Sequence, residues 1–227
     1  MVVVHGFTGI PGHWRLAAEF LSQKGYTVVA PLLPGHGTSV EEMAKFGAPD
    51  WLRAVVESAL TVSDHRRVHL AGLSLGGLLA ILAAGPTNAA SVTAISAPLR
   101  FRRKGIYLAP FLHPFRPYTA WTASPPAGEP ETAELFQTYS GFPTRKATDL
   151  LVVARQARRA ARRLRRPSLV VQSLIDESVD PRSARVLIRA LGTGTQTLWL
   201  QHSRHNALLD RERGLIHEAL LRRLTTA

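Results

Sequence analysis

Residues 72–76 read GLSLG and stand between the apolar run VHLA (68–71) and the small-residue stretch GLLAILAAG (77–85). This pattern predicts a strand that turns at once into a helix, with Ser74 at the turn. The serine hydroxyl is then exposed at the carboxyl edge of a sheet. The flanking glycines are needed because a β-carbon at either would strike the neighbouring strand or helix. We predict that Ser74 is a nucleophile; the alternative is a tight turn with an idle serine.

Strand-like and helix-like segments alternate along the chain around this turn. Apolar or β-branched runs predict strands at 2–4, 26–33, 67–73, 91–97, 168–174 and 195–201. Helical spacing falls between them at 12–24, 50–63, 76–84, 182–191 and 208–224. Such alternation predicts one α/β domain over residues 1–227, with a mostly parallel central sheet flanked by helices.

One region, about residues 99–150, breaks the alternation. Six prolines between residues 106 and 130 stop any long helix there, but the aromatic content is too high for a bare linker. We predict a small cap inserted after the strand at 91–97, although ordinary packing would also explain the composition. The aromatic residues expected to wall a substrate pocket are Phe111, Phe115, Tyr118, Trp121 and Phe136.

A serine nucleophile needs a base, and the base needs a group that orients it. The strand at 168–174 is followed by IDESVDP and the strand at 195–201 by HSRHNALLD, so both loops reach the crevice at the carboxyl edge of the sheet. We predict Asp176 and His205 as the acid and the base. His202 is the competing base. Glu177 and Asp180 are competing acids, but Asp180 precedes Pro181 and is typical of a helix start.

An oxyanion that develops during acyl transfer needs fixed hydrogen-bond donors. Gly6, in HGFTG, allows the chain to turn after the strand at 2–4 so that the amide of Phe7 faces the crevice. The amide of Leu75 follows the nucleophile directly. These two amides are the predicted oxyanion hole; a plain strand-ending turn at His5 and Gly6 is the alternative.

The composition limits the other classes of function. The chain has no cysteine, no apolar run long enough to cross a bilayer and no signal-peptide pattern, so we expect a cytoplasmic protein without thiolate chemistry. The net charge is +12, and 24 of the 28 basic residues are arginine. The densest run, from Arg155 to Arg166, places its arginines on one helix face. We interpret it as a solvated face. A weak contact with an anionic membrane surface is the alternative, and no nucleic-acid-binding module accompanies it.

Several blocks of the sequence, in order, resemble the α/β-hydrolase superfamily, and within it the small bacterial carboxylesterases and monoacylglycerol lipases. The blocks are HGFTG, GYTVVAPLLPGHGTS, DW, AGLSLGG, LVVQSLIDESVDP and HSRHNALLD, which together span nearly the whole chain. The resemblance implies a triad of Ser74, Asp176 and His205 that cleaves short to medium acyl esters through an acyl-serine, with neither metal nor cofactor. Thioester or carbon-carbon hydrolysis by the same residues, and a non-catalytic relic that binds ligands, are the alternatives.

The sequence departs from that family at three places. Two further strands normally precede HGFTG, so we expect a sheet that lacks the usual first strands, or a true start upstream of Met1. Arg204 stands before the expected histidine, where the group often has a small residue. If it pointed inward, its positive charge would lower the histidine pKa. The Pro-rich cap does not follow the group's pattern closely.

Overall fold

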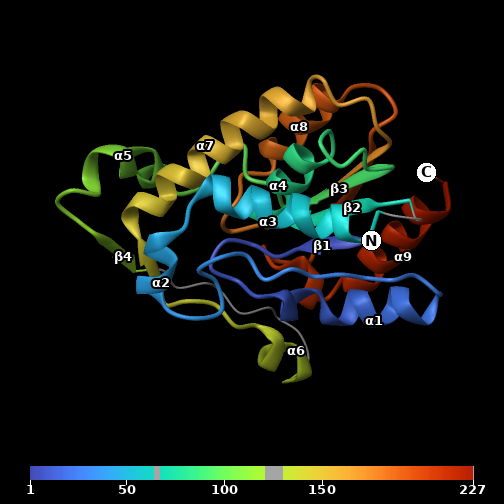
Figure 1. The fold of residues 1–227 in the computed structure, drawn as a ribbon, viewed down its shortest axis with the longest axis horizontal. Coiled ribbons are helices and arrows are strands. Elements are labelled where there is room, and N and C mark those ends of the chain that lie inside the picture. Colours follow the sequence, from blue (N-terminus) through green and yellow to red (C-terminus); the bar gives the residue numbers. More distant parts are fainter. Residues whose placement is uncertain (64–66, 121–129, 227) are drawn as a thin grey trace.

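A five-stranded parallel sheet forms the centre of the computed structural model, which describes residues 1–63, 67–120 and 130–226 (Figure 1). Its described strands, in spatial order, are β1 (Val2–Val4), β2 (His69–Leu73), β3 (Ser91–Ile95), β6 (Ser168–Ser173) and β7 (Gln196–Leu200). All four pairings are parallel, and the register aligns Val4 with Gly72 and Gly72 with Ala94. The α/β prediction is confirmed, and the carboxyl ends of these strands share one edge.

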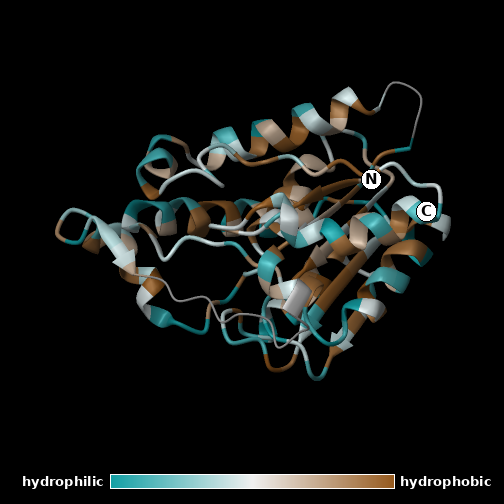
Figure 2. Ribbon diagram, turned by 90° about the horizontal axis from the view of Figure 1, so that it is seen from below, coloured by the Kyte–Doolittle hydropathy of each residue, from teal (hydrophilic) through white to brown (hydrophobic). Residues whose placement is uncertain are grey.

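Helices cover both faces of this sheet because side chains alternate between the faces along each strand. Val2 and Val4 pack in one apolar cluster and Val3 in another. The first cluster lies under α3 (Ala48–Thr61), α4 (Leu75–Ala83), α7 (Thr144–Ala161) and α8 (Arg182–Leu191). The second lies under the 3-10 turn η1 (Pro11–Trp14), α1 (Arg15–Gln23) and α9 (Arg213–Thr226). Figure 1 shows these layers above and below the strands, and the apolar strands lie inside in Figure 2.

The segment between β3 and α7 leaves the sheet. We call residues 99–143 the inserted segment. It contains the 3-10 turn η2 (Lys104–Leu108), α5 (Ala109–Leu112), β4 (Tyr118–Ala120), α6 (Pro130–Leu135) and β5 (Gly141–Pro143), and β4 pairs antiparallel with β5. The other short elements are α2 (Val40–Lys45) and η3 (Ala207–Leu209). In Figure 1, α5 and β4 lie at the end of the molecule opposite the two termini.

One predicted strand, at 26–33, is reduced to a single bridge between Val2 and Val29. The amide of Val29 donates to Met1 O, and the amide of Val3 donates to Val29 O. In a parallel ladder the next donor from this segment is two residues further along, and Pro31 has no N–H. The proline therefore ends the ladder where the apolar pattern alone predicted further pairing.

The arginine-rich run behaves as its spacing predicts. Helix α7 ends at Ala161, and the arginines from Arg155 to Arg166 are exposed, whereas Ala154, Ala157 and Ala161 are buried. The alanines pack under the helix, and the guanidinium groups face solvent. Among the described residues, no helix is both apolar enough and long enough to span a bilayer.

Candidate active site

Ser74 lies at the turn between β2 and α4, at the carboxyl edge of the sheet. Its φ is 55° and its ψ is −117°, a conformation that non-glycine residues seldom adopt and that costs on the order of 1–3 kcal/mol. The surrounding structure holds it there: the amide of Ser74 donates to Ile95 O on β3 at 2.8 Å, and its carbonyl accepts from the amide of Gly77 at 3.0 Å. The predicted nucleophile is therefore one of the strained backbone positions, with Thr8, Asn88 and Ser96.

The two glycines of the GLSLG stretch allow close backbone packing. A β-carbon at Gly72 would lie 2.0 Å from the carbonyl carbon of Gly76, and one at Gly76 would lie 2.1 Å from Val4 O on β1. Both distances are far shorter than any carbon contact with backbone atoms in folded proteins. The expectation that a side chain at either position would strike the neighbouring helix or strand is confirmed.

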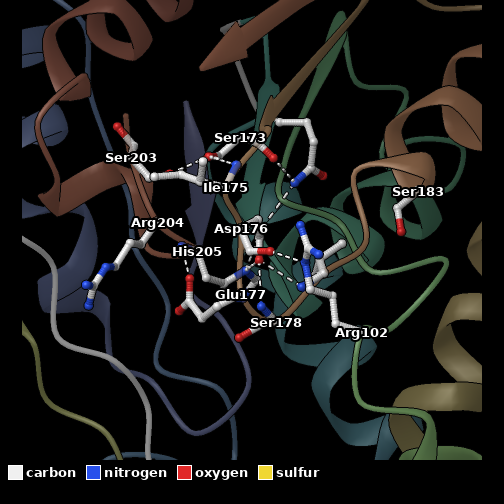
Figure 3. A network of polar contacts seen from close by, with 12 residues as sticks. Arg102, Ser173, Ile175, Asp176, Glu177, Ser178, Ser183, Ser203, Arg204 and His205 are labelled. Atoms are coloured by element: carbon white, nitrogen blue, oxygen red, sulfur yellow. Dashed lines mark hydrogen bonds and ion pairs between the residues drawn. The ribbon is translucent and has the colours of Figure 1, made fainter. Parts of the chain in front are cut away.

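Asp176 and His205 meet across the loops that follow β6 and β7 (Figure 3). His205 Nδ1 lies 2.9 Å from Asp176 Oδ2 and 3.1 Å from Asp176 Oδ1. The carboxylate is fully buried and also accepts from the amides of Ser178 and Val179 and from Gln172 Nε2. A carboxylate held in this way orients the imidazole and stabilises it when it is protonated.

The pKa values of this pair shift in opposite directions. Burial alone would lower the pKa of His205, but the charge of Asp176, its hydrogen bond and the charge of Glu177 outweigh burial and raise it above the ordinary 6.5. Burial alone would raise the pKa of Asp176, but His205 and the amides of Val179 and Ser178 hold it below its ordinary value. The pair therefore favours an ionised acid beside a histidine that accepts a proton readily.

Acidic side chains that sequence reasoning did not assign to the site fix the histidine loop. Glu177 Oε2 accepts from the amide of His205 at 3.1 Å. The carboxylate of Glu212 accepts from the amides of Gln201 and His202 and from Ser203 Oγ, and Asp210 accepts from the amide of Arg204. The sequence feature that could have identified Asp210 and Glu212 is their position only a few residues after His205. The competing residue Glu177 supports the loop from outside the acid–histidine pair.

The other competing residues, His202 and Asp180, and also Arg204 take part in other contacts. His202 is exposed, and Asp180 accepts from the amide and the guanidinium of Arg182 at the start of α8, as expected for a helix-start aspartate. The side chain of Arg204 is exposed and points away from the imidazole of His205 (Figure 3). The inward orientation that would lower the histidine pKa is therefore not adopted.

His5 fixes the loop that follows β1. The amide of Leu33 donates to His5 Nε2 at 3.1 Å, so the other ring nitrogen, Nδ1, carries the proton and donates to Gly6 O at 2.9 Å. Burial and the nearby His36 lower the pKa of His5 well below 6.5, so the ring stays neutral. Holding the carbonyl of Gly6 fixes the peptide plane that also carries the amide of Phe7.

The two predicted oxyanion donors are the amide of Phe7, which follows β1, and the amide of Leu75, which follows Ser74 directly. Phe7 and Ser74 line the same cavity. Leu75 is fully buried as the first residue of α4, where a backbone amide has no partner within the helix. The role of these amides as an oxyanion hole stays a prediction.

A cavity of about 320 Å³ brings these parts together, and Ser74 and His205 both line it. One part of its wall is apolar and comes from the inserted segment, α7 and the Asp176 loop: Phe101, Ile106, Ala109, Leu112, Ala147, Leu150 and Val179. Another part is polar and includes Thr8, His13, Thr138 and Asn206, and the charged residues Arg103, Arg116 and Glu177 also line the cavity. The arrangement can hold a ligand with an apolar arm and a polar group next to the serine.

The predicted pocket aromatics are only partly placed at this cavity. Phe136 lines it and stacks on His13 with ring centroids 5.7 Å apart. Phe111 and Phe115 are 74% and 88% exposed, Tyr118 is 50% exposed, and none of the three lines the cavity. The prediction for these three residues is corrected: in the short helix α5, Ala109 and Leu112 face the cavity instead. Trp121 lies outside the described residues.

Comparison with known families agrees with this geometry. A model described as the alpha/beta hydrolase family matches residues 1–219. The chain belongs to this family. The carboxyl-edge serine turn, followed in the chain by an aspartate and then a histidine, is the arrangement expected of such hydrolases.

Individual relatives of this hydrolase span almost its full length. It is 27% identical to a carboxylesterase of Bacillus subtilis (strain 168), with 96% of this chain and 89% of the relative covered. It is 30% identical to a thermostable monoacylglycerol lipase of Bacillus sp. (strain H-257), with 97% and 88% covered. A solved structure from work on LipS and LipT, two metagenome-derived lipolytic enzymes, superposes with a TM-score of 0.91 at 31% identity, covering 100% of this chain and 93% of that one.

Proposed function

We propose that this hydrolase cleaves short to medium acyl esters of the carboxylesterase or monoacylglycerol type through an acyl-serine intermediate. The observation that carries the proposal is that one cavity is lined both by Ser74, at its strained turn, and by His205, which is hydrogen-bonded to the buried Asp176. The relatives named above, a carboxylesterase and a monoacylglycerol lipase, support the same class of substrate.

In the first step, His205 Nε2 takes the proton of the Ser74 hydroxyl as its oxygen attacks the ester carbonyl carbon. Asp176 holds Nδ1 and stabilises the imidazolium that forms. The amides of Phe7 and Leu75 stabilise the oxyanion, each by about 2.7–4 kcal/mol. The imidazolium then gives its proton to the alcohol oxygen, the alcohol leaves, and the acyl group stays on the serine.

In the second step, water takes the place of the alcohol. His205 removes a proton from the water as it attacks the acyl-serine, and the same proton then returns to Ser74 Oγ when the carboxylic acid leaves. In both steps, the apolar wall that includes Ile106, Ala109 and Leu150 would hold the acyl chain. No group other than these side chains and amides takes part in the steps proposed here.

The decisive experiment compares two serine variants. Ser74→Ala should abolish hydrolysis of p-nitrophenyl butyrate and labelling by a fluorophosphonate probe. The matched control is Ser96→Ala, because Ser96 is a buried serine that follows the neighbouring strand β3 and also has a positive φ, of 49°. This control should keep both properties. Hydrolysis that persists in Ser74→Ala would refute the proposed nucleophile.

A substrate panel then separates the remaining reactions. An acyl series from acetate to palmitate should give its highest kcat/KM at the short to medium lengths. Higher kcat/KM for acyl thioesters or for carbon-carbon substrates would move the assignment to those reactions, and probe labelling without turnover of any substrate would indicate a ligand-binding relic.

A further inference from the structure

The inserted segment exposes large apolar side chains to solvent. Phe111 and Phe115 are 74% and 88% exposed. Other exposed large apolar residues of the same stretch are Tyr107, Leu108, Leu112 and Tyr118. Residues of this kind scattered singly over a surface are ordinary, but six within twelve consecutive positions form a group that indicates an interaction site.

The same stretch is positively charged. Residues 99–120 contain five cationic side chains and neither aspartate nor glutamate. All five, Arg100, Arg102, Arg103, Lys104 and Arg116, are exposed; Arg102 Nε donates to Asp176 O, and Arg103 and Arg116 also line the cavity. Lys104 Nζ lies 6.0 Å from the centroid of the Tyr107 ring, so one cation borders the apolar group directly. Exposed aromatic residues bordered by cations are typical of segments that lie in a lipid interface.

This surface is the outer side of the cavity wall. Ile106, Ala109 and Leu112 of η2 and α5 line the cavity, and Leu112 is also 42% exposed. Both elements lie at the end of the molecule away from the termini (Figure 1). A lipid surface that contacted the outer side of α5 would therefore adjoin the wall of the proposed substrate cavity.

We propose that residues 104–118 are a docking surface for an anionic lipid bilayer. Insertion of the Phe111 and Phe115 rings removes apolar area from water, and the neighbouring cations attract anionic headgroups. A second copy of the chain fits less well, because residues 104–118 carry Lys104 and Arg116 and no acidic residue, so association through this surface would bring like charges together on chains of net charge +12. The charge complementarity thus selects the lipid as the occupant.

The test is vesicle flotation with the Ser74→Ala protein, which makes the result independent of the proposed catalysis. The protein should float with vesicles of phosphatidylcholine and phosphatidylglycerol in equal parts and much less with phosphatidylcholine alone, and added NaCl should weaken the binding. Adding Phe111→Ser and Phe115→Ser should lower the partition coefficient about a hundredfold, because each ring contributes about tenfold. The matched control adds Leu60→Ser and Leu215→Ser, at exposed leucines of α3 and α9, and should bind as before.

Three outcomes would overturn the proposal. The proposed docking surface would be refuted if the protein did not bind the anionic vesicles, or if the leucine control lost as much binding as the phenylalanine variant. If the Phe111→Ser, Phe115→Ser variant still bound the vesicles and an Arg158→Gln, Arg162→Gln variant did not, the membrane contact would lie on α7. This is the alternative interpretation of the arginine run. A dimer in size-exclusion chromatography that Phe111→Ser and Phe115→Ser abolish would assign the surface to a second copy. The phenylalanine substitutions in the Ser74-containing protein should leave hydrolysis of p-nitrophenyl butyrate unchanged, which shows that they do not unfold it.

Discussion

Gly76→Ala tests whether the contact between α4 and β1 sets the geometry at the nucleophile. The added methyl carbon would lie 2.1 Å from Val4 O and 2.6 Å from His5 O. A carbon and a carbonyl oxygen normally approach no closer than about 3.3 Å, so the start of α4 must move from β1 by about 1 Å. Because Ser74 and Leu75 begin that helix and Phe7 follows that strand, the same movement separates the two predicted oxyanion donors.

The expected magnitudes follow from this displacement. A misplacement of about 1 Å at a reacting centre costs about a hundredfold in rate, so kcat/KM for p-nitrophenyl butyrate should fall by about that factor. Overpacking should lower the free energy of unfolding by about 1–3 kcal/mol. Steady-state hydrolysis measures kcat/KM and urea unfolding measures the free energy of unfolding, and both measurements are made on the same preparation.

Gly85→Ala is the matched control, because a β-carbon at Gly85 would meet no atom within 4 Å. It should leave kcat/KM unchanged and change stability by less than about 1 kcal/mol. A folded Gly76→Ala protein with the activity of the wild type would refute the reasoning, since the oxyanion geometry would then not depend on this contact.

Three further predictions concern protonation. The raised pKa of His205 should place the acid limb of kcat/KM above pH 6.5. Asp176→Asn should reduce activity by about 10⁴-fold and move the limb to lower pH, because only the charge of Glu177 then opposes burial; an unmoved limb would contradict the pairing. Arg204→Ala should leave the limb unchanged in the same pH–rate profile, since its side chain faces solvent; a shifted midpoint would show that the guanidinium acts on the imidazole. Burial lowers the pKa of His36 from 6.5 to about 4, so the unfolded chain binds a proton at His36 that the folded chain does not bind. As pH falls from 6.5 to 4, His36 alone should lower the free energy of unfolding by about 3 kcal/mol, in addition to the contributions of His5, His13, His69 and His217, whose pKa values burial also lowers. In urea unfolding, His36→Phe should remove this part of the pH dependence and leave the part that comes from the other four histidines, and a slope equal to that of the wild type would exclude His36 as a source.

The parts of the site predicted from the sequence are those tied to strand ends. The positions of Ser74, Asp176 and His205 follow from three apolar runs that end just before them, and parallel strands bring their carboxyl ends to one edge. The supporting contacts could not be predicted in the same way. That Glu212 holds the histidine loop depends on how η3 turns the chain back, and no periodicity in the sequence specifies that turn.

Local backbone chemistry explains where strand prediction failed. The run at 26–33 is as apolar as a strand, but a ladder needs a donor at every second residue, and Pro31 removes one at the point where pairing would continue. The strand pattern reports only which side chains can be buried. Pairing is decided by the backbone N–H groups, so the proline outweighed the apolar residues.

The aromatic residues of the inserted segment show the same limit for the cavity, and they connect it to the proposed docking surface. Composition predicted that aromatic residues of this segment wall a pocket, but α5 is four residues long, and the residues of α5 that line the cavity are Ala109 and Leu112. Phe111 and Phe115 then have no interior to enter and remain exposed. The cavity wall therefore does not need the two rings. Exposing them to water costs free energy, and this cost is offset only if another apolar phase receives them. Because cations lie nearby in the sequence, the proposed phase is an anionic lipid surface. The vesicle experiment therefore depends on the two residues that were wrongly predicted to wall the pocket.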